Sequence, residues 1–228
     1  MKSDFTLNGY KERLKCDYLD RRSSLLGEVQ RQLIHLLTGI ILILLIRTAG
    51  SRALTLLLLL LAFYILTSVA IFTNKLPPLL STFLCRWGRP SKQSVPLKGT
   101  ILLLCGITFS FILFPEDIIY ASIAIVAFGD SVATAVGVLI GNHKLPYSEQ
   151  KTVEGTISGI VVAFLASSFF VTPVQALVGS VGGMLLESVV DSQTSRGFNS
   201  QTIIKLFFND NFLIPVFSGL LMFVLGLV

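Results

Sequence analysis

The sequence predicts an all-α, polytopic integral membrane protein, because its composition, its apolar runs and its basic residues agree. Of the 228 residues, 53% are apolar and only 14% are charged, and the mean hydropathy is +0.77. The apolar residues gather in seven separate runs, and the basic residues are distributed unevenly among the connecting segments. So much apolar side chain excludes a disordered chain and argues against an ordinary water-soluble enzyme.

The seven apolar runs define the expected membrane helices. They are rich in Leu and do not alternate with polar residues, which favours helices over the strands of a barrel. A straight crossing needs about 20 residues, so the first and third runs are short unless flanking Arg and Lys side chains reach the headgroups. The expected helices cover 32–46, 53–73, 100–114, 118–141, 156–172, 174–191 and 212–228.

The basic residues predict a cytosolic N-terminus. If each run crosses once, every Lys and Arg except Arg47 and Arg52 lies on the side of the N-terminus, as positive-inside insertion requires. Residues 1–27 are then a basic cytosolic arm, and residues 28–228 form one membrane domain. This asymmetry accounts for the net charge of +5, and no basic and aromatic motif indicates nucleic-acid binding.

Asp130 is the polar residue placed deepest in an apolar run. Twelve residues separate it from Ile118, which is about 18 Å along a straight helix. An ionised Asp at that depth costs roughly 2.5–3.5 kcal/mol on insertion scales. Such a residue usually has a function, and a protonated, hydrogen-bonded structural Asp is the alternative.

Small residues surround Asp130 on its own helix. Gly129, Ala133, Gly137 and Gly141 recur every four residues, so they form a ridge against which a neighbouring helix or a ligand can lie closely. Packing is the simpler interpretation of this ridge. Gly129, directly before the acid, could also break the helix and open a polar pocket.

The loop after this helix, 141–156, carries residue types that suit a phosphate. Lys151 supplies positive charge, and hydroxyl and N–H groups of Thr152, Gly155 and Thr156 lie at the start of the next helix, where the helix dipole favours anions. This is not a Walker A loop, and an exposed connecting loop can look similar. Its place next to Asp130 strengthens the interpretation, because a nucleoside triphosphate needs a carboxylate that holds Mg²⁺ and a cationic, amide-rich loop.

Further polar groups are expected at the same cytosolic ends. The first helix presents Glu28, Arg31 and His35 on one side, where an ion pair that anchors the helix end is the alternative. Other polar groups are Lys98-Gly99 before the third helix, Glu187 and Asp191 one turn apart in the sixth helix, and Asn209-Asp210-Asn211 before the seventh.

Two of these segments together resemble a known family. Residues 128–137 read Phe-Gly-Asp-Ser-Val-Ala-Thr-Ala-Val-Gly, and 151–159 read Lys-Thr-Val-Glu-Gly-Thr-Ile-Ser-Gly. The pair resembles the CTP-dependent lipid-alcohol kinases: the dolichol (polyprenol) kinases, the phytol kinases and the fungal CTP-dependent diacylglycerol kinase. The Glu-x-x-Arg-x-x-x-His start, Lys98-Gly99 and the ending at 209–215 are also similar, so the resemblance covers about 28–219. Gln32 departs from it, because a basic residue is expected there.

The resemblance implies an all-helical membrane kinase that uses CTP and Mg²⁺ and assigns roles to the polar residues. It implies catalytic roles for Asp130, Lys151, Glu154 and Asp210, with Glu154 either ordering the loop or sharing the metal. Metal ligands would be Asp130, Glu187 and Asp191, and the acceptor of the substrate proton stays open among Asp210, Glu187 and Asp191. Nucleotide contacts would come from Arg31, His35, Lys98, Gly129, Lys144, Lys151, Thr152, Gly155 and Thr156.

The expected reaction is phosphorylation of a membrane isoprenoid alcohol, of the dolichol or polyprenol kind, with release of CDP. Phytol or diacylglycerol as substrate, or a CTP:lipid-phosphate cytidylyltransferase, are the alternatives, and an ion-coupled transporter is the non-enzyme alternative. The expected partners are CTP and the lipid alcohol, with the active site facing the cytosol. The sequence leaves the oligomeric state open, with a homodimer as one option.

Overall fold

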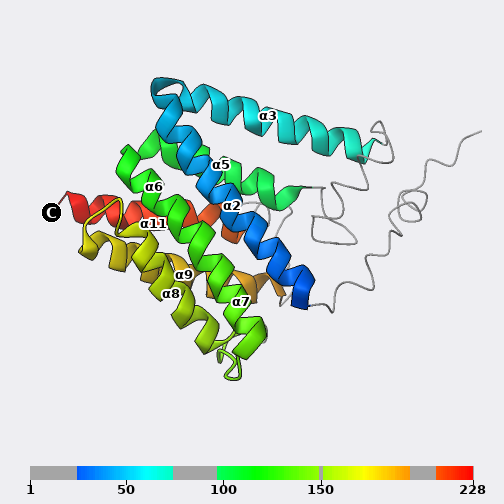
Figure 1. The fold of residues 1–228 in the computed structure, drawn as a ribbon, viewed down its shortest axis with the longest axis vertical. Helices are drawn as coiled ribbons and strands as arrows, with labels where there is room; N and C mark the ends of the chain where they lie inside the picture. The colour runs from blue at the N-terminus through cyan, green and yellow to red at the C-terminus, as the bar shows by residue number, and fades with distance from the viewer. Residues whose placement is uncertain (1–24, 74–96, 149–150, 196–208, 228) are drawn as a thin grey trace, which may run out of the picture.

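The computed structural model describes residues 25–73, 97–148, 151–195 and 209–227, and in this part of the chain it is all-helical apart from one isolated β-bridge. Figure 1 shows the helices as a single bundle. The side chains of Glu28 and of 191–195 lie outside the described part, as does nearly all of the predicted N-terminal arm. The described elements are α2 (Leu25–Ala49), η2 (Gly50–Arg52), α3 (Ala53–Phe72), α5 (Lys98–Leu113), α6 (Glu116–Ala124), η3 (Ile125–Asp130), α7 (Ser131–Ile140), α8 (Val153–Ser167), α9 (Pro173–Ser195) and α11 (Asp210–Gly226).

Each predicted apolar run coincides with helix in the structure. Three helical segments are long and apolar enough to cross a membrane by length and composition: Val29–Ile71, which includes the break at η2, Glu116–Ile140 and Pro173–Val190. Helices α5, α8 and α11 are apolar and shorter. The first helix is longer than expected, since α2 has 25 residues and includes the polar positions before residue 32. The fifth is shorter than its run, because α8 ends at Ser167.

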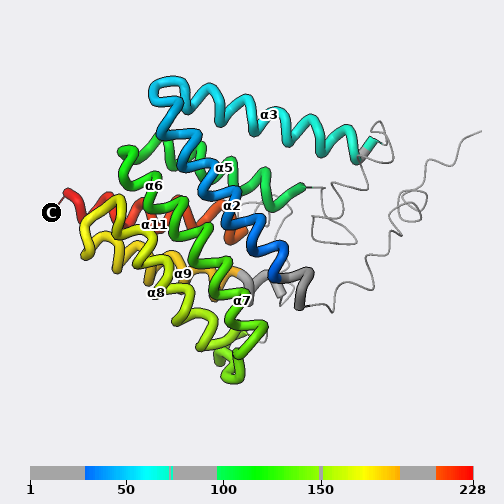
Figure 2. Tube along the Cα trace, viewed as in Figure 1, coloured from blue at the N-terminus to red at the C-terminus, as the bar shows by residue number. Residues whose placement is uncertain are grey.

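The helices run back and forth between two ends of the bundle. In Figure 1 the turn between α2 and α3, the turn between α5 and α6, and the C-terminus gather toward one end. The start of α2, the start of α5, the end of α7 and the start of α11 lie toward the other, and Figure 2 shows the same path. This second end is where the sequence places the candidate site residues.

The helical segment from Glu116 to Ile140 forms the centre of the core. Most of its apolar side chains between residues 118 and 127 are buried, with Ile119, Ile123 and Ile125 each at most 1% exposed, whereas Val138, Leu139 and Ile140 at its end are exposed. Helices α2, α8, α9 and α11 pack around it. In contrast, α3 lies at the edge of the bundle (Figure 1) and exposes large apolar side chains such as Phe63 and Leu66.

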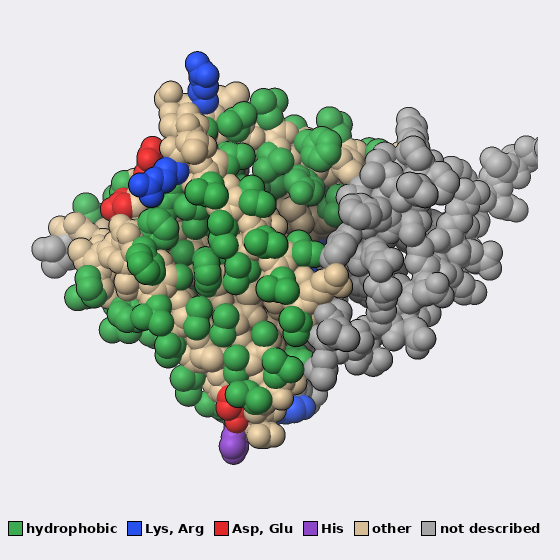
Figure 3. Space-filling model, in the orientation of Figure 1, with side chains coloured by type: hydrophobic (Ala, Val, Ile, Leu, Met, Phe, Trp, Pro, Cys, Tyr) green, Lys and Arg blue, Asp and Glu red, His purple; other side chains and the backbone are tan. Residues whose placement is uncertain are grey.

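A broad apolar surface covers the bundle between its ends. Figure 3 shows charged side chains at separated edges of this face, with mainly apolar side chains between them. Large apolar residues on α2, α3 and α8 are more than half exposed, among them Leu37, Leu59 and Leu165. An exposed apolar area of this size is typical of a surface that meets lipid.

Candidate functional site

The helix that carries Asp130 changes its winding at this residue. Residues Ile125–Asp130 form a π-helical turn, a local widening that often occurs at functional sites. Helix α2 packs closely against this turn at Gly39, where an added Cβ atom would collide with the Cβ atom of Ala127. The Ser131 hydroxyl donates a hydrogen bond to the backbone carbonyl of Gln32 at 3.1 Å. The first helix is therefore fixed against the turn that holds the acid.

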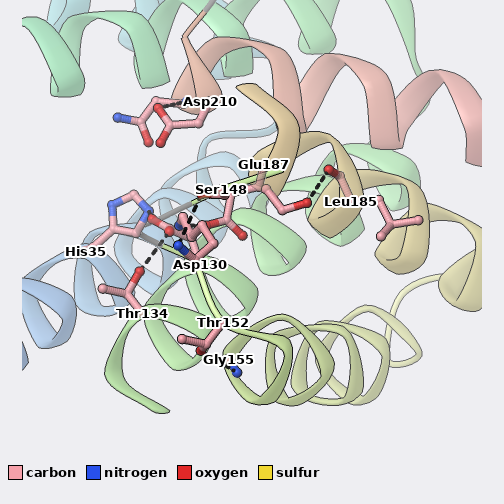
Figure 4. Close-up of polar contacts among 12 residues, drawn as sticks. His35, Asp130, Thr134, Ser148, Thr152, Gly155, Leu185, Glu187 and Asp210 are labelled. Atoms are coloured by element: carbon pink, nitrogen blue, oxygen red, sulfur yellow. Dashed lines mark hydrogen bonds and ion pairs between the residues drawn. The ribbon is translucent and has the colours of Figure 1, made fainter. Parts of the chain in front are cut away.

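Two side chains contact the Asp130 carboxylate from α2 and α7. The His35 Nε2 atom lies 3.7 Å from Asp130 Oδ2, and the two side chains are 19% and 16% exposed. The Thr134 hydroxyl donates to Asp130 Oδ1 at 3.3 Å. Figure 4 shows the three side chains directed toward one another. Thr134 is one helical turn after Asp130, a spacing that could have identified it from the sequence.

A lysine and a second carboxylate complete this cluster. The Lys151 ammonium forms an ion pair with Glu187 Oε1, and the Glu187 side chain is only 2% exposed while that of Lys151 is 17% exposed. The carboxyl groups of Glu187 and Asp130 lie close enough to interact with each other. We call Asp130, Lys151 and Glu187 the charged cluster; its members come from η3, the loop before α8, and α9 (Figure 4).

The loop that carries Lys151 is fastened to its surroundings. The Tyr147 hydroxyl and the Ser188 hydroxyl are 2.9 Å apart, which ties the loop to α9. The backbone N–H of Lys151 donates to Ser148 Oγ at 3.2 Å, and Lys144 forms an isolated antiparallel bridge with Thr152. The side chain of Lys144 is exposed. Sequence reasoning did not identify Tyr147, Ser148 or Ser188 as site residues.

The start of α8 is packed tightly against α7. Thr152 is the N-cap of α8 and its hydroxyl accepts a hydrogen bond from the Gly155 N–H at 3.2 Å. Thr152, Gly155 and Thr156 are all buried. A Cβ atom on Gly155 would lie 2.6 Å from the carbonyl oxygen of Ala133. In this conformation these residues shape the loop, and the small-residue ridge serves helix packing.

This packing predicts a large effect of a small substitution. Gly155→Ala should lower the free energy of unfolding by about 1–3 kcal/mol, because the new methyl group meets backbone that cannot move aside. Thermal unfolding of the purified protein in detergent measures this. Gly183→Ala is the matched control, since its Cβ would meet only side-chain atoms, at 3.1 Å and beyond. Equal melting temperatures for the two variants would contradict the tight α7–α8 contact.

Glu154 lies in the first turn of α8, outside the apolar run, and contacts the loop that precedes this helix. It binds His143: the His143 backbone N–H donates to the Glu154 carboxylate at 3.1 Å, and the His143 Nδ1 atom is 2.6 Å from Glu154 Oε1. The His143 side chain is 82% exposed. Of the two roles considered for Glu154, these contacts agree with the one in which it orders the loop.

The contacts of Glu154 predict a pH dependence. The hydrogen bond from His143 lowers the pKa of Glu154 from an ordinary 4.5 to about 2. Since the folded-state pKa is depressed, the stability from this carboxylate is fully present above pH 4.5 and is lost as the pH falls toward 2. The difference in melting temperature between the protein and its Glu154→Gln variant should therefore be constant down to about pH 4.5 and shrink below it. A difference that already fades between pH 7 and 5 would contradict this assignment.

Residues of two distant motifs meet beside the cluster, where α5 and α11 begin. The Asn211 side-chain N–H donates to the backbone carbonyl of Gly99 at 3.3 Å, which brings Lys98, the first residue of α5, next to the start of α11. Asp210 Oδ1 accepts from the Asn211 N–H at 2.8 Å. Figure 4 shows the Asp210 side chain on the side of the cluster that α11 occupies.

Of the other predicted residues, Arg31 is half-buried on α2, and the Asp191 side chain lies outside the described part.

The carboxylates fit a hard divalent cation that also binds substrate. Within the described ranges, no three His, Cys, Asp or Glu side chains gather as a metal site. Asp130 and Glu187 nevertheless offer carboxylate oxygens close together, with the Thr134 hydroxyl beside them. Mg²⁺ typically takes one or two carboxylates from the protein and completes its coordination with phosphates and water. The oxygen donors therefore suit Mg²⁺ that is bound together with a nucleotide.

The chain is homologous to lipid kinases, which confirms the resemblance predicted from its motifs. It is 27% identical over 143 residues to CTP-dependent diacylglycerol kinase 1 of Eremothecium gossypii, covering 58% of this chain and 45% of the relative. It is 32% identical over 133 residues to the chloroplastic farnesol kinase of Arabidopsis thaliana, covering 57% of this chain and 43% of the relative. The matched regions thus span less than half the length of each relative. No protein-family model and no solved structure matches the chain.

Proposed function

We propose that this protein is a CTP-dependent kinase that phosphorylates the hydroxyl group of a membrane isoprenoid alcohol and releases CDP. The observation that carries the proposal is the charged cluster, in which Asp130 and Glu187 meet Lys151. Asp130 and Lys151 belong to the two motifs that resemble the kinase family, and the cluster provides what phosphoryl transfer needs, namely positioned carboxylates for a metal and a cation for phosphate.

Residues around the cluster would position the triphosphate. Lys151, with Lys144, Lys98 and Arg31 as further cations, would bind phosphate oxygens. Thr152, Gly155 and Thr156 would act by holding the Lys151 loop against α7, and Gly129 by letting α8 come close to Asp130. Asp130 and Glu187 would hold Mg²⁺, which when bound neutralises the charge of the phosphates; Asp191, one turn further along α9, is the proposed additional ligand.

In the reaction the lipid hydroxyl oxygen attacks the γ-phosphorus of CTP, and the bond to the β–γ bridging oxygen breaks to release CDP. The hydroxyl proton must pass to a base. We assign this task to His35: its Nε2 atom faces Asp130 at 3.7 Å, so the Nδ1 atom would accept the proton of the lipid hydroxyl. Asp130 would orient the imidazole and stabilise its protonated form. This proposal replaces the carboxylates that the sequence left open for the role, Asp210 among them.

We further propose seven membrane crossings with the charged cluster at the cytosolic end. The alternating directions of the helices support this topology (Figure 1), together with the placement of all Lys and Arg residues except Arg47 and Arg52 on one side. CTP is water-soluble and the alcohol has a long apolar tail, so a site at the inner helix ends gives access to both.

The choice of lipid rests on the two relatives. One is a farnesol kinase, and farnesol, like dolichol and other polyprenols, is an isoprenoid alcohol with a terminal hydroxyl. The other is a diacylglycerol kinase, which makes diacylglycerol the second candidate substrate. The apolar tail would lie against side chains of the bundle.

A labelling experiment tests the reaction and the lipid together. The purified protein is incubated with CTP labelled at the α- or the γ-phosphate, Mg²⁺, and in turn farnesol, phytol, a polyprenol, diacylglycerol or the monophosphate of one of these lipids. A kinase transfers only the γ-label to an isoprenoid alcohol, and replacing CTP by ATP abolishes the transfer. Label from the α-phosphate in the lipid, with release of pyrophosphate, would instead identify a cytidylyltransferase and refute the proposal.

A further inference from the structure

The charged cluster contains two carboxylates and one ammonium group. Glu187 is 2% exposed and its partner Lys151 is 17% exposed, and the Asp130 carboxyl group lies within interaction distance of Glu187. A carboxylate buried this completely needs a cation beside it, because its own hydration is lost. In the structure as it stands, the ammonium of Lys151 is that cation.

Lys151 cannot fulfil this task and bind a phosphate group equally well. The ammonium is a compact charge with three donors on a flexible stem. If it turns toward a phosphate, Glu187 and Asp130 are left beside each other without their positive charge. A divalent cation on the two carboxylates would more than replace that charge. Binding of the cation and release of the lysine are therefore linked through the same oxygen atoms.

The surrounding contacts allow the side chain to move while the loop stays in place. The Tyr147–Ser188 hydrogen bond ties the loop to α9, and the Lys151 backbone N–H donates to Ser148 Oγ. Neither contact involves the Lys151 ammonium, so only the rotatable bonds of this side chain need to change.

We propose that Lys151 is the resting counter-ion of the Asp130–Glu187 pair and that it exchanges with the divalent cation when the metal–nucleotide complex binds. Lys151 then leaves Glu187 for a phosphate oxygen. As a consequence, metal and nucleotide bind cooperatively, and the metal alone binds weakly because it competes with the lysine. This inference rests on the proposed function and adds to it an explanation of how the site stays neutralised between reaction cycles.

Mn²⁺ binding tests the exchange without any turnover. It is measured by electron paramagnetic resonance, in which the signal of free Mn²⁺ decreases as the ion binds. In nucleotide-free buffer, Lys151→Met should bind Mn²⁺ about tenfold more tightly than the unmodified protein. Lys151→Arg should not, because it keeps the competing charge. Unchanged or weaker Mn²⁺ binding by Lys151→Met would overturn the exchange.

A second variant gives an independent test if Lys151→Met does not fold. Glu187→Gln removes the partner that holds the lysine, so CTP binding in the presence of a metal chelator should become about tenfold tighter. Unchanged or weaker binding would overturn the inference. Failure of the proposed function looks different: the unmodified protein would then not transfer the γ-label of CTP to a lipid alcohol, while the comparison of Mn²⁺ affinities would still decide whether Lys151 competes with the metal.

Discussion

Asp130→Asn should reduce transfer of the γ-phosphoryl group from CTP by at least about a thousandfold, the scale of losing one principal charge-stabilising group in phosphoryl transfer. Asparagine keeps the size of the side chain and can still contact Thr134 and His35, and it removes the negative charge. Rates are measured as initial velocities of label transfer, with the lipid in excess and CTP varied up to saturation. The loss should appear in kcat at saturating CTP, because the charge acts on the reacting phosphate.

The matched control is Asp117→Asn. This exposed acid lies in the same continuous helical segment at the opposite end of the bundle, so its loss should leave the rate within about twofold of the unmodified protein. Both variants should keep the melting temperature of the parent. Full activity of Asp130→Asn, or an equal loss in both variants, would remove Asp130 from the mechanism.

The second large effect concerns stability. Lys151→Met should lower the free energy of unfolding by about 3 kcal/mol, because it leaves the buried Glu187 without its partner. For a chain of this length that corresponds to a fall in melting temperature of roughly 6–12 °C. Glu187→Met should cost less, since the Lys151 ammonium can reach water when it is released. The double variant should be more stable than Lys151→Met alone, because no unpaired charge stays buried.

A double-mutant cycle from thermal unfolding in detergent measures this coupling. Strictly additive effects of the two substitutions would show that the ion pair does not contribute to folding. The unfolding measurement does not depend on substrate, so the assignment of the pair can be tested separately from the assignment of the reaction.

The positions of the helices could be predicted well, because short-range features of the sequence determine where each helix begins and ends. Apolar runs bounded by polar residues and by proline and glycine place the helix ends to within a few residues, as at α3, whose run was expected at 53–73 and which spans Ala53–Phe72. The nearness of Asp130 and Lys151 was also predictable, because the loop directly follows the helix that carries the acid. Helix α2 starts earlier than its apolar run, since polar residues such as Arg31 continue the helix beyond the apolar stretch.

The partners of the charged residues could not be predicted, because they depend on packing between distant segments. Lys151 meets Glu187 from 36 residues away, and no local spacing distinguishes that acid from Asp191. Hydrophobic periodicity also does not predict the π-helical turn that ends at Asp130 or the close approach of α2 to this turn at Gly39. Glu154 was expected either to order the loop or to share the metal, and its contact with the loop histidine His143, which no motif predicted, agrees with the first role.

The most direct test of the central claim is an experimental structure of the protein with Mg²⁺ and a CTP analogue whose β–γ bridge cannot be cleaved. We predict the terminal phosphates next to Lys151, with the metal ion between them and the carboxylates of Asp130 and Glu187. A triphosphate bound elsewhere, with the Lys151–Glu187 pair still closed, would contradict the account.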